Sequence, residues 1–266
     1  MFAEANICLL LSSGSPTKAC PEFVEWVGDD IPRASCLKAK RSQTPTPYNL
    51  PPITYIHSMN LLEFLKPMPV VGILRDIPHG AEEACVETAA RCGLKAIEVT
   101  MNTAGATSII KKLKDCAGSY EILVGAGTVR HESDLEKAVA AGAEFIVTPN
   151  TRKEIVRLSN TAGIPIIPGA LSPTEVQKAY DLGAAAVKVF PVNCVGGPEY
   201  IKALRGPFRD IPLMACGGVN PQNAKAYMEA GANLISFGGS IFNPTLMANG
   251  NWDEIEIRLT ALLQSI

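Results

Sequence analysis

Short apolar runs alternate with longer amphipathic segments from residue 70 to the end of the chain. The runs cover 70–74, 96–100, 121–127, 144–149, 164–170, 185–191, 211–218 and 234–239. Most are apolar at successive positions, which is typical of parallel strands covered on both faces. Between them, apolar residues recur every three or four positions, which predicts helices. The pattern therefore predicts an α/β fold of eight strand–helix units, with the last helix in 253–266.

The predicted helices have recognisable starts and ends. Thr151 with Glu154, and Ser172 with Glu175, have the spacing of a capping box, in which the two side chains satisfy free backbone N–H groups. Seven glycines follow predicted helices, where a left-handed residue is favoured, at positions 93, 118, 142, 163, 183, 206 and 231. Their spacing of about 20 to 25 residues fits one short strand plus one helix of average length.

Eight such units in about 200 residues predict a (β/α)8 TIM barrel near the lower size limit of that fold. A doubly wound open sheet is the competing architecture. It is disfavoured because no G-x-G-x-x-G sequence follows the first strand. We therefore expect a single barrel over residues 59–266.

Residues 1–58 have a different character. They are rich in Pro, Ser and Thr and lack a sustained period of 2 or 3.6, which is typical of a linker or a disordered segment. Met59 directly precedes the first regular pattern. Two interpretations stay open: a disordered N-terminal extension, or an upstream stretch that is not part of the protein.

Composition excludes several classes of function. The 266 residues carry a formal net charge of −2 without an extended basic cluster, which argues against a nucleic-acid surface. No apolar stretch approaches the roughly 20 residues of a membrane span. The eight cysteines form no C-x-x-C pair, as expected for reduced thiols in a cytoplasmic protein. The three histidines lack partners at ligand spacing, so no metal site is predicted.

Lys188 interrupts the apolar run AAAVKVFPVN at 184–193, although lysine is rarely buried without a partner or a chemical role. By alternation, its side chain faces either the surrounding helices or the barrel interior. The interior is favoured, because Arg75, Glu98 and Thr128 stand at or near the ends of other predicted strands. Active sites of these barrels form at those strand ends.

Burial beside Arg75 leads us to expect a depressed pKa for Lys188. A neutral amine attacks ketones and forms a Schiff base. Glu98 could then move the protons that imine chemistry requires. The structural alternative is that Lys188 and Glu98 form only a buried ion pair, which stabilises a fold weakly at best.

The last two predicted strands end in CGGV and FGGS, and both place glycine amides at a strand-to-helix turn. Glycine lets the backbone approach an anion closely, and the start of the following helix favours negative charge. The loops after strands 7 and 8 form the usual phosphate site of a TIM barrel. The two turns therefore indicate a phosphorylated carbonyl substrate.

Several motifs together resemble the class I 2-keto-3-deoxy-6-phosphogluconate (KDPG) and 4-hydroxy-2-oxoglutarate (KHG) aldolases. They are EVTMNT at 98–103, GAGTV at 125–129, FIVTP at 145–149, IPIIPGALSPTE at 164–175, AVKVFP at 186–191, GGPEYIKALRGPF at 196–208 and GGVN at 217–220. The resemblance covers roughly residues 59–266. It implies a lyase without metal or cofactor, a cytoplasmic homotrimer of the Entner–Doudoroff pathway. Such an enzyme cleaves KDPG to pyruvate and glyceraldehyde 3-phosphate, and also KHG to pyruvate and glyoxylate.

Carried over by position, the resemblance makes Lys188 the Schiff-base lysine and Glu98 the acid/base residue. It implies substrate binding by a further set of residues: Arg75, Thr128, Pro149, Phe190, Gly217, Gly218, Gly239 and Ser240. Asn102 is a departure, because some members have a carboxylate-binding arginine there. Which residue holds the substrate carboxylate stays open, with Arg75 and Thr128 as candidates.

Three alternatives accompany this prediction. A 2-keto-3-deoxy-6-phosphogalactonate aldolase differs in the configuration of one substrate carbon and shares these motifs. An isomerase or epimerase on the same phosphate-binding barrel generally works without an imine lysine, so Lys188 disfavours it. A non-catalytic phosphosugar-binding barrel is disfavoured by the presence of both Lys188 and Glu98.

Overall fold

A computed structural model describes residues 60–266 of the chain. The two interpretations of residues 1–58 concern a segment outside the described residues. No helix among the described residues is long and apolar enough to cross a membrane.

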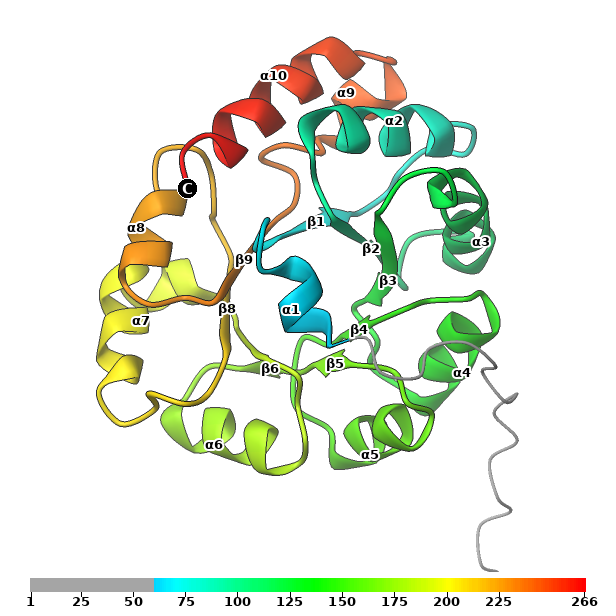
Figure 1. The fold of residues 1–266 in the computed structure, drawn as a ribbon. Helices are drawn as coiled ribbons and strands as arrows, with labels where there is room; N and C mark the ends of the chain where they lie inside the picture. The colour runs from blue at the N-terminus through cyan, green and yellow to red at the C-terminus, as the bar shows by residue number, and fades with distance from the viewer. Residues whose placement is uncertain (1–59) are drawn as a thin grey trace, which may run out of the picture. The chain divides into compact units, whose positions relative to one another are not determined.

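The strands form one parallel sheet that curves into a barrel (Figure 1). They are β1 (Val70–Leu74), β2 (Ala96–Thr100), β3 (Leu123–Gly127), β4 (Ile146–Val147), β5 (Ile166–Ile167), β6 (Gly169–Ala170), β7 (Val187–Val189), β8 (Leu213–Cys216) and β9 (Leu234–Phe237). Their order is β5-β4-β3-β2-β1-β9-β8-β7-β6. The two ends of this order, β5 and β6, follow each other in the chain around Pro168, which has no N–H to donate to a ladder. They are the two halves of the predicted fifth strand, so the (β/α)8 barrel is confirmed.

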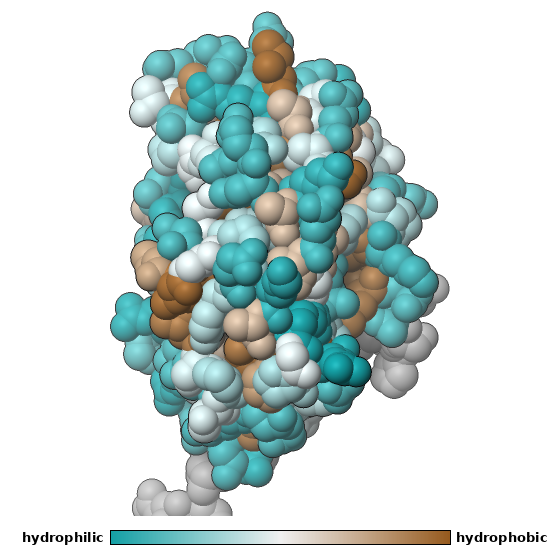
Figure 2. Space-filling view, turned by 90° about the vertical axis from the view of Figure 1, so that its left-hand side faces the viewer, coloured by the Kyte–Doolittle hydropathy of each residue, from teal (hydrophilic) through white to brown (hydrophobic). Residues whose placement is uncertain are grey.

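Helices surround the sheet and supply the outer layer of the fold (Figure 1). They are α2 (Glu82–Cys92), α3 (Ala106–Ala117), α4 (Glu132–Ala140), α5 (Lys153–Thr161), α6 (Pro173–Asp181), α7 (Pro198–Arg205), α8 (Ala224–Glu229), α9 (Pro244–Ala248) and α10 (Trp252–Leu263). Their apolar faces pack on the outward side chains of the strands in the larger of two buried clusters. The side of the barrel that carries α7 and α8 is mostly hydrophilic, with small separate hydrophobic areas (Figure 2), which is ordinary for a folded surface.

A second buried cluster fills the inside of the barrel. Strand residues alternate between the two clusters: Val187 and Val189 belong to the outer one, and Ala186 to the inner one. The short helix α1 (Leu61–Leu65) places Leu61 and Leu65 in the inner cluster. In Figure 1, α1 lies across the middle of the ring of strands. The interior is therefore packed with apolar side chains at the α1 end, and polar groups are confined to the opposite, carboxyl ends of the strands.

Two details of the predicted helix boundaries need correction. The Ser172–Glu175 capping box is confirmed, whereas α5 begins at Lys153 with Arg152 as its N-cap. The Thr151 hydroxyl donates instead to the carbonyl of Gly169, so it links the loop after β4 to β6 and caps no helix. Five of the seven glycines have positive φ, but those at positions 118 and 206 have φ of −58° and −51°. Gly118 and Gly206 therefore mark the ends of α3 and α7 as predicted, but they do not adopt the left-handed conformation.

Candidate active site

Lys188 lies in the middle of β7 and faces the barrel interior, as predicted. Its Cα pairs with those of Gly169 on β6 and Met214 on β8, and Met214 belongs to the inner cluster. Only 6% of Lys188 is exposed. Its Nζ lies 5.3 Å from the centre of the Phe190 ring, within range of a cation–π contact. The lysine is thus enclosed while its amine reaches toward the open end of the barrel.

Glu98 lies on β2, two residues after Ala96 of the inner cluster, and is 1% exposed. Its carboxylate lies over Gly127 on β3, where an added Cβ would be only 2.5 Å from Oε1. The other oxygen, Oε2, is buried without a hydrogen-bond partner among the described residues. A glycine thus makes room for a carboxylate that keeps one oxygen free to bind a ligand or accept a proton.

The pKa of Lys188 differs from the prediction. Burial acts to lower this pKa, but Cys216 and Glu98 act to raise it, and the balance lies above the ordinary value of a lysine. The expectation of a depressed pKa is wrong, because the neighbouring Cys216 and Glu98 side chains together favour the ammonium. The surroundings of Lys188 therefore favour its ammonium form.

Glu98 has the electrostatic character of a base. Burial raises its pKa, and the positive charges of Lys188 and Arg75 only partly oppose that effect. A carboxylate with a raised pKa is a stronger base than one in water. The site therefore pairs an enclosed ammonium with a carboxylate able to accept its proton.

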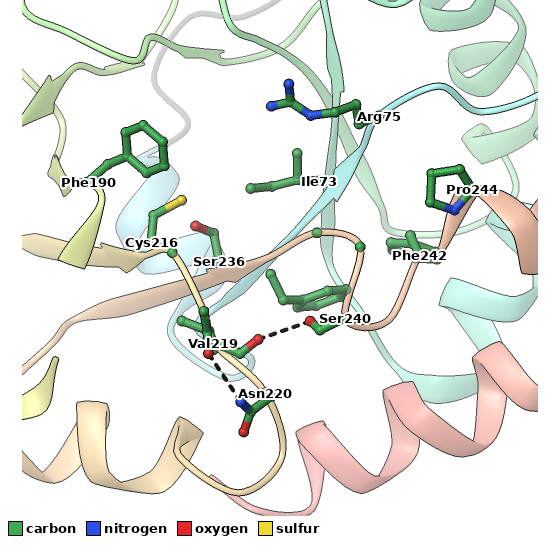
Figure 3. Close-up of a pocket in the computed structure, with 15 residues that line it drawn as sticks. Ile73, Arg75, Phe190, Cys216, Val219, Asn220, Ser236, Ser240, Phe242 and Pro244 are labelled. Atoms are coloured by element: carbon green, nitrogen blue, oxygen red, sulfur yellow. Dashed lines mark hydrogen bonds between the residues drawn. The ribbon is translucent and has the colours of Figure 1, made fainter. Parts of the chain in front are cut away.

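A pocket of about 410 Å³ opens beside this pair, at the carboxyl ends of β1, β7, β8 and β9 (Figure 3). Predicted site residues that line it are Arg75, Phe190, Gly217, Gly218, Gly239 and Ser240. In Figure 3, the Arg75 guanidinium and the Phe190 ring stand on the side of the pocket opposite the glycine turns. Arg75 is near enough to affect the pKa of both Lys188 and Glu98, which places the pocket next to these two residues.

The two glycine turns are held against each other. Gly217 and Gly218 have φ of 111° and 69°, a conformation that glycine adopts without strain. The Ser240 hydroxyl donates to the carbonyl of Val219, which joins the turn after β9 to the turn after β8 (Figure 3). Asn220 donates from its side-chain amide to the carbonyl of Gly218. The backbone of this part of the pocket is therefore fixed before a ligand arrives.

Besides Lys188 and Glu98, which lie next to the pocket, three predicted site residues do not line it. Pro149 packs against β6. If Gly169 carried a Cβ, that atom would lie 2.3 Å from the carbonyl carbon and oxygen of Pro149. Thr128 follows β3 directly, is half-buried, and has φ of 55°, which is uncommon for a non-glycine residue. Asn102 is exposed in the turn after β2. The sequence placed these residues at the correct end of the barrel, and the structure does not bring them into the pocket.

Three polar residues of the pocket were missed by the sequence argument: Asn220 in the turn after β8, and two residues on strands. Cys216 ends β8, and its thiol is close enough to hydrogen-bond to Lys188 and to affect the lysine's pKa. Ser236 lies on β9, is 1% exposed and also lines the pocket. The alternation of side chains along a strand could have revealed Cys216 and Ser236. They lie two residues after Met214 and Leu234, which face the barrel interior.

Across residues 60–266, no three His, Cys, Asp or Glu side chains gather in a way that could hold a metal ion. The described cysteines are all free thiols, at positions 85, 92, 116, 194 and 216.

Comparison with known proteins identifies relatives of the whole barrel. Residues 61–258 match the family model described as KDPG and KHG aldolase. A 2-dehydro-3-deoxy-phosphogluconate aldolase of Haemophilus influenzae is 36% identical over 197 residues, 73% of this chain and 89% of that protein. A 2-dehydro-3-deoxy-6-phosphogalactonate aldolase of Escherichia coli is 33% identical over 176 residues, 66% of this chain and 85% of that protein.

A solved structure gives the same result for the fold. KDPG aldolase from Legionella pneumophila, with pyruvate captured as a covalent carbinolamine intermediate, superposes with a TM-score of 0.67 at 26% identity. The match covers 77% of this chain and 98% of that one.

Proposed function

The chain belongs to the KDPG and KHG aldolase family, and from this premise we propose that it cleaves KDPG through a Schiff base on Lys188. The products are pyruvate and glyceraldehyde 3-phosphate, and KHG is cleaved to pyruvate and glyoxylate. The observation that carries the proposal is the enclosed Lys188–Glu98 pair beside a pocket lined by two glycine turns. An ion pair with only a structural role would not explain the free Oε2 of Glu98.

The chemistry begins with the resting ammonium of Lys188. Glu98 takes its proton, and the neutral amine adds to the C2 carbonyl of the substrate. Glu98 then gives this proton to the carbinolamine hydroxyl, which leaves as water. Loss of water forms the protonated imine, and Glu98 is again a carboxylate. Glu98 next takes the C4 hydroxyl proton while the C3–C4 bond breaks and its electrons move to the imine nitrogen. Glu98 returns this proton to C3 of the enamine, and water releases pyruvate from Lys188.

The remaining pocket residues would hold the two anionic ends of the substrate. Backbone amides of the turns at 217–218 and 238–240 are proposed to bind the phosphate. Arg75 is the charged side chain of the pocket and is our candidate for the carboxylate, because Asn102 is neutral. Thr128, which does not line the pocket, is the alternative, through its hydroxyl. Phe190 would form an apolar wall around pyruvate, whereas Pro149 does not line the pocket and its binding role stays a prediction from the sequence.

A coupled assay with lactate dehydrogenase tests the function, since each turnover releases pyruvate. We expect turnover of KDPG and slower turnover of KHG. The epimer 2-keto-3-deoxy-6-phosphogalactonate is the second candidate substrate, favoured by the similarity to the 2-dehydro-3-deoxy-6-phosphogalactonate aldolase of Escherichia coli. The ratio of kcat/KM for the two epimers decides between them. Failure of all three substrates to yield pyruvate would contradict the proposal.

Further properties follow from the family resemblance. We propose a cytoplasmic homotrimer of the Entner–Doudoroff pathway whose activity resides in residues 59–266. The free thiols at the five described cysteine positions support a reducing compartment. Light scattering after size-exclusion chromatography would measure the mass of the assembly.

Gly239 offers a clean test of the phosphate site. An added Cβ there has no atom within 4 Å and its φ needs no left-handed conformation, so Gly239→Val should fold normally. The new side chain would stand where the phosphate approaches the backbone. We expect KM for KDPG to rise about tenfold or more, with little change for KHG, which has no phosphate. Equal losses on both substrates would contradict a phosphate site at this turn. Gly218 is a poorer choice, because its φ of 69° and a contact of 3.0 Å with Asn193 would add strain.

Gly127 tests the placement of the Glu98 carboxylate. Gly127→Ala would put a methyl group 2.5 Å from Oε1, so the carboxylate must move. Because a displacement of about 1 Å can cost roughly 100-fold in rate, we expect kcat to fall 10- to 100-fold with little change in KM. Gly118→Ala is the matched control, since its nearest contact is 3.5 Å and its φ is helical. A normal kcat in Gly127→Ala would show that the position of Glu98 is not critical.

A further inference from the structure

Ser236 is an exception among the buried hydroxyl groups of the barrel. Among the buried hydroxyl groups of residues 60–266, the Oγ of Ser236 alone has no hydrogen-bond partner. The other buried threonines and serine all have one, at Thr88, Thr100, Thr103, Thr148 and Ser159. Leaving a hydroxyl buried without a partner costs about 1 to 3 kcal/mol. The exception therefore indicates a group that finds its partner only when a ligand is bound.

The register of the strands places this hydroxyl in the substrate's path. Ser236 pairs with Cys216 on β8 and with Val71 on β1, and Val71 lies in the inner cluster. Across the sheet, Lys188 pairs with Met214, and Met214 pairs with Leu234. Ser236 comes two residues after Leu234 on β9, so it lies about 7 Å closer to the carboxyl ends of the strands. The phosphate turn begins at Gly238. Ser236 thus lies between the level of the Schiff-base lysine and the phosphate turn.

The direction of the side chain agrees with this placement. Figure 3 shows Ser236 with its hydroxyl directed away from its strand, toward the Cys216 side chain and the interior of the pocket. Ser236 lines the same pocket as Arg75 and the glycine turns. A ligand that runs from Lys188 to these turns passes the hydroxyl.

We propose that Ser236 hydrogen-bonds to the C5 hydroxyl of the phosphorylated substrate and selects for substrates that carry this group. The inference rests on the proposed function. The C2 carbonyl is assigned to Lys188, the C4 hydroxyl to Glu98 and the phosphate to the turns. The C5 hydroxyl is the remaining polar group of the chain between C2 and the phosphate. Ser236 is the unpaired neutral group at the corresponding level of the pocket.

The synthetic direction provides a sharp test, because the aldehyde can be varied by one atom. Pyruvate is combined either with glyceraldehyde 3-phosphate, whose C2 hydroxyl becomes the C5 hydroxyl, or with 3-phosphopropanal, which has the same phosphate and lacks that hydroxyl. We expect the wild-type enzyme to prefer glyceraldehyde 3-phosphate by about tenfold in kcat/KM, the range of one hydrogen bond. In Ser236→Ala, this preference should disappear while 3-phosphopropanal reacts about as well as before.

Ser159→Ala is the matched control, because Ser159 is also fully buried but bonds to the carbonyl of Ile164 on the outer side of the barrel. It should keep the wild-type preference. An unchanged preference in Ser236→Ala, or equal losses with both aldehydes, would overturn the inference and leave the aldolase function intact. A wild-type protein that joins pyruvate to neither aldehyde and also fails to cleave KHG would overturn the proposed function, and the inference with it.

Discussion

Lys188→Met is expected to abolish turnover while the barrel stays folded. Methionine is close to lysine in length and fits an interior that already contains Met214. It cannot attack a carbonyl, and no Schiff base can form without the amine. We expect kcat for KDPG to fall by about four orders of magnitude or more, because the uncatalysed cleavage lacks the electron sink of the imine.

Three measurements separate loss of chemistry from loss of structure. Circular dichroism should still show a folded barrel, and the thermal midpoint should fall, since Glu98 stays buried without the neighbouring ammonium of Lys188. Borohydride reduction with pyruvate should add a stable mass to Lys188 in the wild-type protein, located by peptide mass spectrometry. The adduct should be absent in Lys188→Met. An adduct on another lysine, or near-normal turnover in the variant, would contradict the mechanism.

The position of Lys188 could be predicted from the sequence because alternation in a strand is a local property. Its neighbours Val187 and Val189 pack outward, so the lysine must face inward. The direction of its pKa could not be predicted, because it depends on which strands lie beside β7. Cys216 lies on the adjacent strand β8 and raises the pKa of Lys188. Arg75, the neighbour assumed from the sequence, lowers this pKa, but its effect is smaller than that of Cys216.

Other differences also arise from contacts between distant segments. The strand–helix count predicted the barrel, but the break of the fifth strand at Pro168 depends on the loss of one ladder hydrogen bond. Thr151 has capping-box spacing, yet its hydroxyl bonds to Gly169, which local sequence does not reveal. Ser236 was missed because serine in an apolar run resembles ordinary core packing. Its significance lies in a partner that is missing, and that can be recognised only in three dimensions.

Glu98→Gln is expected to stop the reaction at a different step from Lys188→Met. Glutamine keeps the shape that fits over Gly127 but cannot accept a proton. Imine formation should continue slowly, so borohydride should still trap pyruvate on Lys188. Cleavage should fall by roughly 100- to 10,000-fold, the usual contribution of a general acid or base. Exchange of the pyruvate methyl protons in D2O, followed by NMR, should fall in parallel, because Glu98 is proposed to move the C3 proton.

The pH dependence supplies an independent check on Glu98. Burial raises the pKa of this carboxyl, so as pH falls it takes up a proton at a higher pH than an exposed glutamate, whose pKa is about 4.3. As the pH falls, the carboxylate form of Glu98 is therefore lost at a higher pH than that of an exposed glutamate. The midpoint of the acid limb in the wild-type kcat profile should lie above about 4.3. In Glu98→Gln, the residual activity should lack this limb, since the group that titrates is gone. If the limb persisted in the variant, another residue would have to be the base, and the free Oε2 of Glu98 would need a different explanation.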